Sequence, residues 1–211
     1  GPLSFEYFFN ENKIITNCGY GSQISKKAEL LSRLTSAQST LCINDTSVTK
    51  FERSKLINNA FGTSIKNTFK VFDENYNEDN SSIEIIASHN AYEKKFGYIH
   101  KRSIKMSKND GNLFGYDQLI KKKDETFNLS YSIRFHLYPG ISAIQTMGGN
   151  NILLQIEKNK SLIFSSDEEK ISIEKSIFLG RNKILNNFCI TIYGETNNKD
   201  KTVNWQIKKN N

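Results

Sequence analysis

FNLSYSIRFHLY, residues 127–138, is the stretch that decides the fold class. Apolar residues occupy every second position, and small or charged residues stand between them. Successive side chains of a β-strand point to opposite faces, so this alternation predicts a half-buried strand. Its apolar face comprises Phe127, Leu129, Tyr131, Ile133, Phe135 and Leu137, and its polar face carries Ser132, Arg134 and His136.

About a dozen short segments of this kind follow one another, with turn residues between them. Asn109-Asp110-Gly111 predicts a hairpin that joins strands at 98–106 and 112–120. DENYNEDN, residues 73–80, is acidic and Asn-rich and predicts an exposed loop, whereas 26–34 allows one short helix. Many short strands with turns and at most one short helix are typical of an all-β sandwich or barrel.

The sequence gives no sign of a boundary between domains. Gly1 and Pro2 have the form that a cleaved purification tag leaves behind, and residues 3–211 contain no repeat or low-complexity linker. We therefore expect a single domain from 3 to 211. Within it, 48–63 has no clear period and is expected to be irregular, while 64–72 alternates weakly, as in a strand.

Charge and cysteine usage limit the possible partners. The formal net charge is +7, which favours acidic partners such as nucleic acid, a membrane surface or an acidic polysaccharide. The alternative is a solvated surface, because the lysines are scattered. Cys18, Cys42 and Cys189 are too far apart for a metal motif, and buried free thiols are expected in preference to one disulfide. No apolar run is long enough to cross a membrane.

Four segments, in this order, resemble one known family. They are LSFEYFFNENKIITNCG (3–19), LTSAQSTLCIND (34–45), ASHNAYEKKFGYIHKRSI (87–104) and IRFHLYPGISA (133–143). Together they resemble the C-terminal half of heparinase II/III-like proteins, especially bacterial ones of alphaproteobacterial type. The resemblance extends from Leu3 to about Tyr193, and the segments at 87–104 and 133–143 are its most specific parts.

The resemblance implies an antiparallel β-sandwich that follows an N-terminal helical toroid domain in a longer parent chain. It implies a polysaccharide lyase, periplasmic or extracellular, that cuts uronic-acid chains by β-elimination. Such chemistry needs an acid/base pair and fixed donors for the negative charge that develops on the uronate. In this family a Tyr and an Asn or His for that purpose lie on the toroid, so we expect the sandwich alone to be inactive.

Members with a structural zinc ion take ligands from a His-rich stretch that would precede Leu3, from an Asp before a Gly, and from a His in a sequence like AHST. Here the last two positions hold Asn17 and Gln38. Neutral amides are poor zinc ligands beside carboxylate and imidazole. We therefore expect no metal and no other cofactor. A hydrogen bond between Asn17 and Gln38 in place of the metal is a hypothesis.

Two pairs of candidate site residues lie between 87 and 106. His89 is either an exposed acid/base or uronate-binding group or a loop histidine that bonds nearby backbone, and Tyr92 either presents its hydroxyl to sugar or packs. His100 and Arg102 share a strand face, and the planar guanidinium of arginine suits a carboxylate. The alternative for Arg102, which we favour slightly, is an internal pair with Asp117 or Glu84.

Arg134 and His136 form the second candidate pair, on the polar face of 127–138. They contact substrate if that face is open and are structural if another layer covers it. His89, His100 and His136 are thus the catalytic candidates, and Tyr92, Arg102 and Arg134 the substrate-binding ones. Trp205 is either a sugar-stacking platform or, more commonly at such a position, a core anchor.

Several function classes lack their signatures. The sequence shows no nucleophile triad, no evident pair of glycosidase carboxylates and no glycine-rich phosphate loop, and only 92–105 interleaves basic and aromatic residues as a nucleic-acid site does. The first hypothesis is the sandwich domain of a polysaccharide lyase, forming one wall of its groove. The alternatives are a domain that only binds acidic glycan, and a purely structural sandwich.

Overall fold

The alternating stretch around residue 130 forms strand β8, Ser130–Leu137. Ile133, Phe135 and Leu137 are fully buried on one face of it, as predicted. Phe127 lies before the strand and is 82% exposed, so its assignment to this apolar face is wrong. The pairing of β8 with its neighbour begins at Ser130, and the two-residue period has no meaning before the chain enters the sheet.

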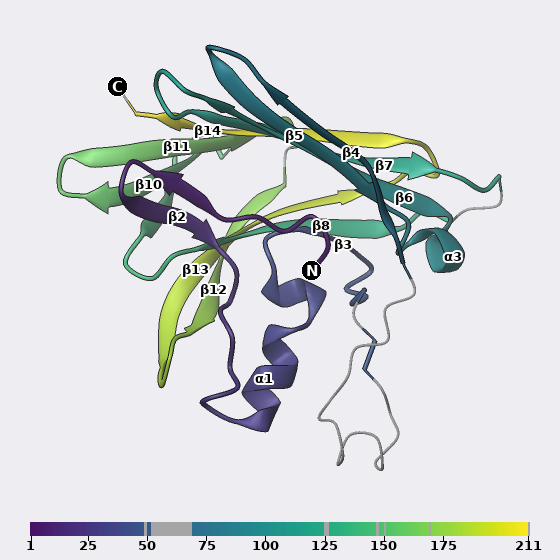
Figure 1. Ribbon diagram of the computed structural model, residues 1–211, viewed down its shortest axis with the longest axis horizontal. Coiled ribbons are helices and arrows are strands. Elements are labelled where there is room, and N and C mark those ends of the chain that lie inside the picture. Colours follow the sequence, from purple (N-terminus) through teal and green to yellow (C-terminus); the bar gives the residue numbers. More distant parts are fainter. Residues whose placement is uncertain are drawn as a thin grey trace.

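The computed structural model describes residues 1–48, 50–51, 69–124, 127–146, 148–149, 151–168 and 170–210. Two antiparallel sheets pack face to face, which confirms the predicted sandwich (Figure 1). The strand order of the six-stranded sheet is β1 (Tyr7–Phe9), β2 (Asn12–Thr16), β8, β13 (Ile184–Glu195), β12 (Ile171–Leu179). The sixth strand, β3 (Leu41–Ile43), also pairs with β8. The order of the eight-stranded sheet is β4 (Val71–Glu78), β5 (Ser82–His89), β6 (Tyr98–Ser107), β7 (Leu113–Lys121), β14 (Lys201–Lys209), β11 (Lys160–Ser166), β10 (Asn151–Glu157), β9 (Ser142–Gln145).

Aromatic side chains fill the space between the two sheets. The Phe135 ring lies edge-on to Phe164 and to Trp205, with 4.9 Å between centroids in both pairs. Phe5 stacks on Trp205 at 5.6 Å and lies edge-on to Phe135 at 6.3 Å. Trp205 is therefore a core residue, 2% exposed, and not a platform for sugar. Cys18, Cys42 and Cys189 are buried free thiols, as expected.

The helical segments are short and lie outside the two sheets. Helix α1 (Lys26–Ser32) begins at Ser25, whose hydroxyl accepts the backbone N–H of Ala28, and a 3₁₀ turn η1 (Thr35–Ala37) follows. Helix α3 (Glu93–Phe96) is a single turn between β5 and β6. Figure 1 shows α1 beside the six-stranded sheet, on the side away from the eight-stranded one. Among the described residues no helix is both long and apolar enough to cross a bilayer.

Two local predictions have opposite outcomes. The hairpin at 109–111 forms between β6 and β7, with Gly111 at φ +71°. The exposed loop predicted for 73–80 is wrong, because most of it belongs to β4. This strand lies at the sheet edge and buries none of its side chains, so its composition resembles a loop. The predictions for 48–63 and 64–72 fall mostly outside the described residues. Of these two segments the structure describes residues 48, 50, 51 and 69–72.

Candidate functional site

A buried carboxylate on β7 bonds two of the four candidates from residues 87–106, His100 and Arg102. Asp117 is 1% exposed, and both of its oxygens accept hydrogen bonds from Arg102, from Nε at 2.8 Å and from Nη2 at 2.9 Å. His100 Nε2 lies 2.6 Å from Oδ1, and Trp205 Nε1 donates to Oδ2 at 2.9 Å. The internal partner of Arg102 is thus Asp117, one of the two alternatives that the sequence left open.

The hydrogen bonds fix the tautomers of two histidines. The backbone N–H of Ala91 donates to His89 Nδ1 at 3.2 Å, so the proton of neutral His89 is on Nε2. This Nε2–H donates to His100 Nδ1 at 3.0 Å, so the proton of His100 is also on Nε2, from which it donates to Asp117. His89 and His100 are both fully buried, which excludes the exposed position considered for His89.

Arg102 also connects the sheets to the N-terminal segment. Its Nη1 donates to the carbonyl oxygens of Leu3 and Ser39, each at 2.8 Å. Tyr92 is 1% exposed and donates its hydroxyl to the Leu41 carbonyl at 2.9 Å. Both side chains therefore bond backbone of the first 43 residues and face the protein interior.

Arg134 and His136 lie on the outer face of β8, which the segment around η1 covers. His136 Nε2–H donates to the Ser36 carbonyl at 3.0 Å, and its Nδ1 lies 3.1 Å from the Ser176 hydroxyl. Arg134 bonds the Ser132 hydroxyl at 2.7 Å and Asp45 at 3.0 Å. Only 13% of the Arg134 side chain is exposed, and His136 is 4% exposed, so this face is not open to a polysaccharide.

Asn17 and Gln38, which occupy the positions of the family's zinc ligands, form hydrogen bonds with backbone groups. Asn17 Oδ1 accepts the N–H of Ser39 at 2.9 Å, and Gln38 Nε2 donates to the Ser32 carbonyl at 2.8 Å. These contacts replace the amide–amide bond of our hypothesis, for which the structure gives no support. Across the described ranges no three His, Cys, Asp or Glu side chains gather as ligands for one ion. The absence of zinc stays a prediction.

Burial lowers the pKa of all three histidines, that of His89 to about 2 and that of His136 to about 4. A histidine in the unfolded chain titrates near 6.5, so below that pH the unfolded chain binds more protons than the folded one and stability falls. We expect the free energy of unfolding to drop by roughly 1 kcal/mol for each of His89 and His136 between about pH 7.5 and about pH 5.5. Urea midpoints at the two pH values measure this; equal midpoints would contradict it. The lowered pKa of Asp117 matters only at more acidic pH.

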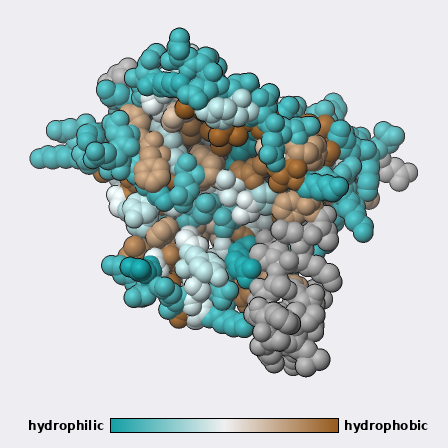
Figure 2. Space-filling view, in the orientation of Figure 1, coloured by the Kyte–Doolittle hydropathy of each residue, from teal (hydrophilic) through white to brown (hydrophobic). Residues whose placement is uncertain are grey.

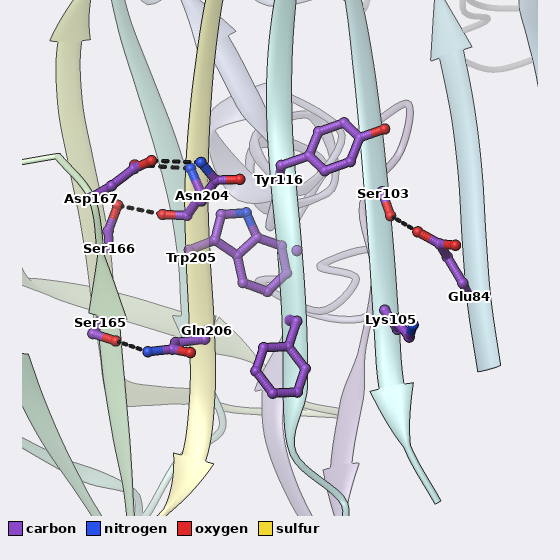
Figure 3. Close-up of a pocket in the computed structure, with 12 residues that line it drawn as sticks. Glu84, Ser103, Lys105, Tyr116, Ser165, Ser166, Asp167, Asn204, Trp205 and Gln206 are labelled. Atoms are coloured by element: carbon purple, nitrogen blue, oxygen red, sulfur yellow. Dashed lines mark hydrogen bonds between the residues drawn. The ribbon is translucent and has the colours of Figure 1, made fainter. Parts of the chain in front are cut away.

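Two open grooves lie on the surface; Arg102 is among the residues that line the first, and Trp205 is among those that line the second. A groove of about 470 Å³ separates the N-terminal segment from β5 and β6, and apolar side chains such as Phe8, Ile85 and Met106 line it. Figure 2 shows hydrophobic residues gathered in the hollow between the upper sheet and the N-terminal segment. A second groove of about 560 Å³ lies on the outer face of the eight-stranded sheet (Figure 3).

Apart from Trp205, which also lines it, sequence reasoning did not propose the residues of the outer groove as a site. Phe114, Tyr116, Asn204 and Gln206 lie in it, and they alternate with inward-facing residues of β7 and β14. The one available signal was the pair of aromatic residues two positions apart in 112–120. The cross-strand pairing that brings 114–116 beside 204–206 cannot be read from one sequence.

Residues 1–206 match the sequence pattern of the heparinase II/III-like, C-terminal family. The chain belongs to this family. Among solved structures, heparan sulfate lyase HepC from Pedobacter heparinus has a TM-score of 0.73 and 12% identity over 98% of this chain. The heparinase III that is the BT4657 gene product gives 0.72 and 13%, and another heparinase III gives 0.69 and 14%, each over 98% of this chain.

The heparinase II/III-like assignment confirms the resemblance, and the solved structures support the shared fold. The chain spans about 30% of the length of these relatives, 30% of HepC and 29% of the last heparinase III. It therefore corresponds to one part of such proteins. No curated protein matches the chain.

Proposed function

We propose that this chain is the β-sandwich domain of a polysaccharide lyase that acts on uronic-acid-containing polysaccharide by β-elimination. The observation that carries the proposal is the family match over residues 1–206. The structures with the same fold belong to heparan sulfate lyases and heparinases III, and the net charge of +7 suits an acidic substrate.

In this proposal the sandwich supplies a frame and a wall of the substrate groove, and it does not supply the acid/base pair. His89, His100 and His136 donate or accept hydrogen bonds inside the protein, and each is buried. A general acid or base must come within hydrogen-bonding distance of the proton it transfers. The catalytic side chains then belong to another part of the parent chain, which fits the 30% share of the relatives that this chain spans.

We also propose that the apolar groove beside Leu3–Phe8 packs against the N-terminal domain of the same parent protein. Its lining includes Ile85, which is 55% exposed, and Phe8, which is 52% exposed. Exposed apolar side chains grouped in one hollow are typical of surfaces that another protein part covers. The relatives have more than two thirds of their length outside the matched part, which supplies such a partner.

The test is an incubation of the full-length parent protein with a panel of acidic polysaccharides. β-Elimination leaves an unsaturated uronate, so ultraviolet absorbance should rise with at least one substrate. The 211-residue chain alone should give no rise, and a His136→Gln parent that remains folded should retain most of its rate. Binding of the panel without any rise would favour the glycan-binding alternative. Loss of all activity in folded His136→Gln protein would show that His136 takes part in catalysis.

A further inference from the structure

The outer face of the eight-stranded sheet carries two parallel rows of side chains. In the first row Tyr116 of β7 lies between Ser103 of β6 and Asn204 of β14, its directly paired residues. The second row has the same pattern, with Phe114 between Lys105 and Gln206. Each row therefore places one aromatic ring between polar groups, and together the rows form the floor of the 560 Å³ groove.

The polar side chains of the groove are held in place by neighbours. Asn204 Nδ2 donates to Asp167 at 2.6 Å, Gln206 Nε2 donates to the Ser165 hydroxyl at 2.9 Å, and the Ser103 hydroxyl donates to Glu84 at 2.7 Å (Figure 3). These bonds leave the amide oxygens of Asn204 and Gln206 as acceptors. Because the side chains are already ordered, a ligand that bonds them loses less conformational entropy on binding.

The aromatic rings give the groove an apolar component. Phe114 is 37% exposed although it lies mid-way along the sheet, and Lys208 Nζ is 5.2 Å from its ring centroid. Figure 3 shows the Tyr116 hydroxyl directed toward the β6 side of the groove. Its hydroxyl has no hydrogen bond among the described residues and is available to a ligand. Rings flanked by fixed acceptors suit a ligand with an apolar face and a rim of hydroxyls.

The charges in and beside the groove balance, so they give no net attraction for an acidic ligand. The carboxylates of Glu84 and Asp167 line it together with the ammonium group of Lys105, and Lys208 lies beside Phe114. Among the residues that the structure describes, no arginine lines it to bind a carboxylate through two parallel bonds. Carboxylates facing a uronate would repel it, whereas sugar hydroxyls can donate to them.

We propose that this groove is a binding site for a neutral saccharide, with sugar rings stacked on Phe114 and Tyr116 and hydroxyls bonded to Asn204 and Gln206. The site goes beyond the proposed lyase function and does not depend on it. The groove volume lies within the usual range of small-molecule sites.

The test titrates the 211-residue chain with a neutral cello-oligosaccharide, a neutral N-acetylchito-oligosaccharide and an acidic oligogalacturonide, with backbone amide NMR shifts as readout. At least one neutral probe should shift the amides of Gly115, Tyr116 and Asn204. Phe114→Ala and Tyr116→Ala should each weaken binding about tenfold or more. Tyr76→Ala is the matched control, since Tyr76 is 59% exposed on β4 outside the groove.

Five outcomes separate the possibilities. Shifts confined to the groove and lost in both groove variants support the site. Amide shifts outside the groove would overturn it. So would groove variants that bind the probe as tightly as the unaltered chain, or no binding of either neutral probe. Tighter binding of the acidic probe in the groove would overturn the neutral class. All readouts come from binding to the isolated chain, so they stay informative whether or not the parent protein has lyase activity.

Discussion

Asp117→Asn is expected to lower the free energy of unfolding by about 3–5 kcal/mol. The substitution keeps the size of the side chain but removes the negative charge that faces the Arg102 guanidinium. The Arg102 side chain is only 2% exposed, so water cannot replace the carboxylate. It also gives the Nε2–H of His100 and the Nε1–H of Trp205 a weaker acceptor. An uncompensated charge inside a protein costs much more than the pair contributes when intact. Denaturant unfolding of the 211-residue chain measures the loss.

The control for Asp117→Asn is Glu78→Gln, which removes an ion pair at the surface. Glu78 lies 2.7 Å from Lys108, and its side chain is 45% exposed, so solvent screens the interaction. This variant should leave the denaturation midpoint almost unchanged. If Asp117→Asn were equally mild, the carboxylate would not be what holds Arg102 and His100 in place.

Phe135→Ala is expected to cost about 3–5 kcal/mol. The ring is fully buried between the sheets and contacts Phe164 and Trp205, so its removal loses apolar burial and leaves a cavity that the rigid strands cannot close. Phe127→Ala is the matched control, because the same alternation contains both residues but Phe127 is 82% exposed. It should change stability by less than about 0.5 kcal/mol. Equal losses in the two variants would contradict the placement of both rings.

The comparison of Phe135 with Phe127 also shows what the sequence can determine. Alternation fixes which residues share a face while the chain stays in a strand, and it predicted the buried face of β8 correctly. It does not say where the strand begins, since that depends on pairing with β13. The exposed edge strand β4 was missed for a related reason: a strand with no buried face has no apolar period to detect.

The candidate site was harder to predict because burial of a polar face depends on distant segments. Arg134 and His136 occupy the polar face of β8 as predicted, but residues 17–39 cover that face through contacts such as that between His136 and Ser36. The pair between Arg102 and Asp117 was one of two internal alternatives, and the structure places the two residues directly opposite each other on β6 and β7. The link from His89 to His100 depends on the register between β5 and β6, which the sequence leaves open.

The central claim is that the histidines of the sandwich are structural groups of its interior and do not take part in a reaction. Nitrogen-15 NMR of the imidazole rings, followed from about pH 8 to about pH 5, tests it most directly. The account predicts that His89 remains neutral across this range, that the pKa of His100 lies below its ordinary value, and that each neutral ring is a single tautomer with its proton on Nε2. His89 or His100 titrating near the ordinary histidine pKa of about 6.5 would contradict it, since that requires access to solvent.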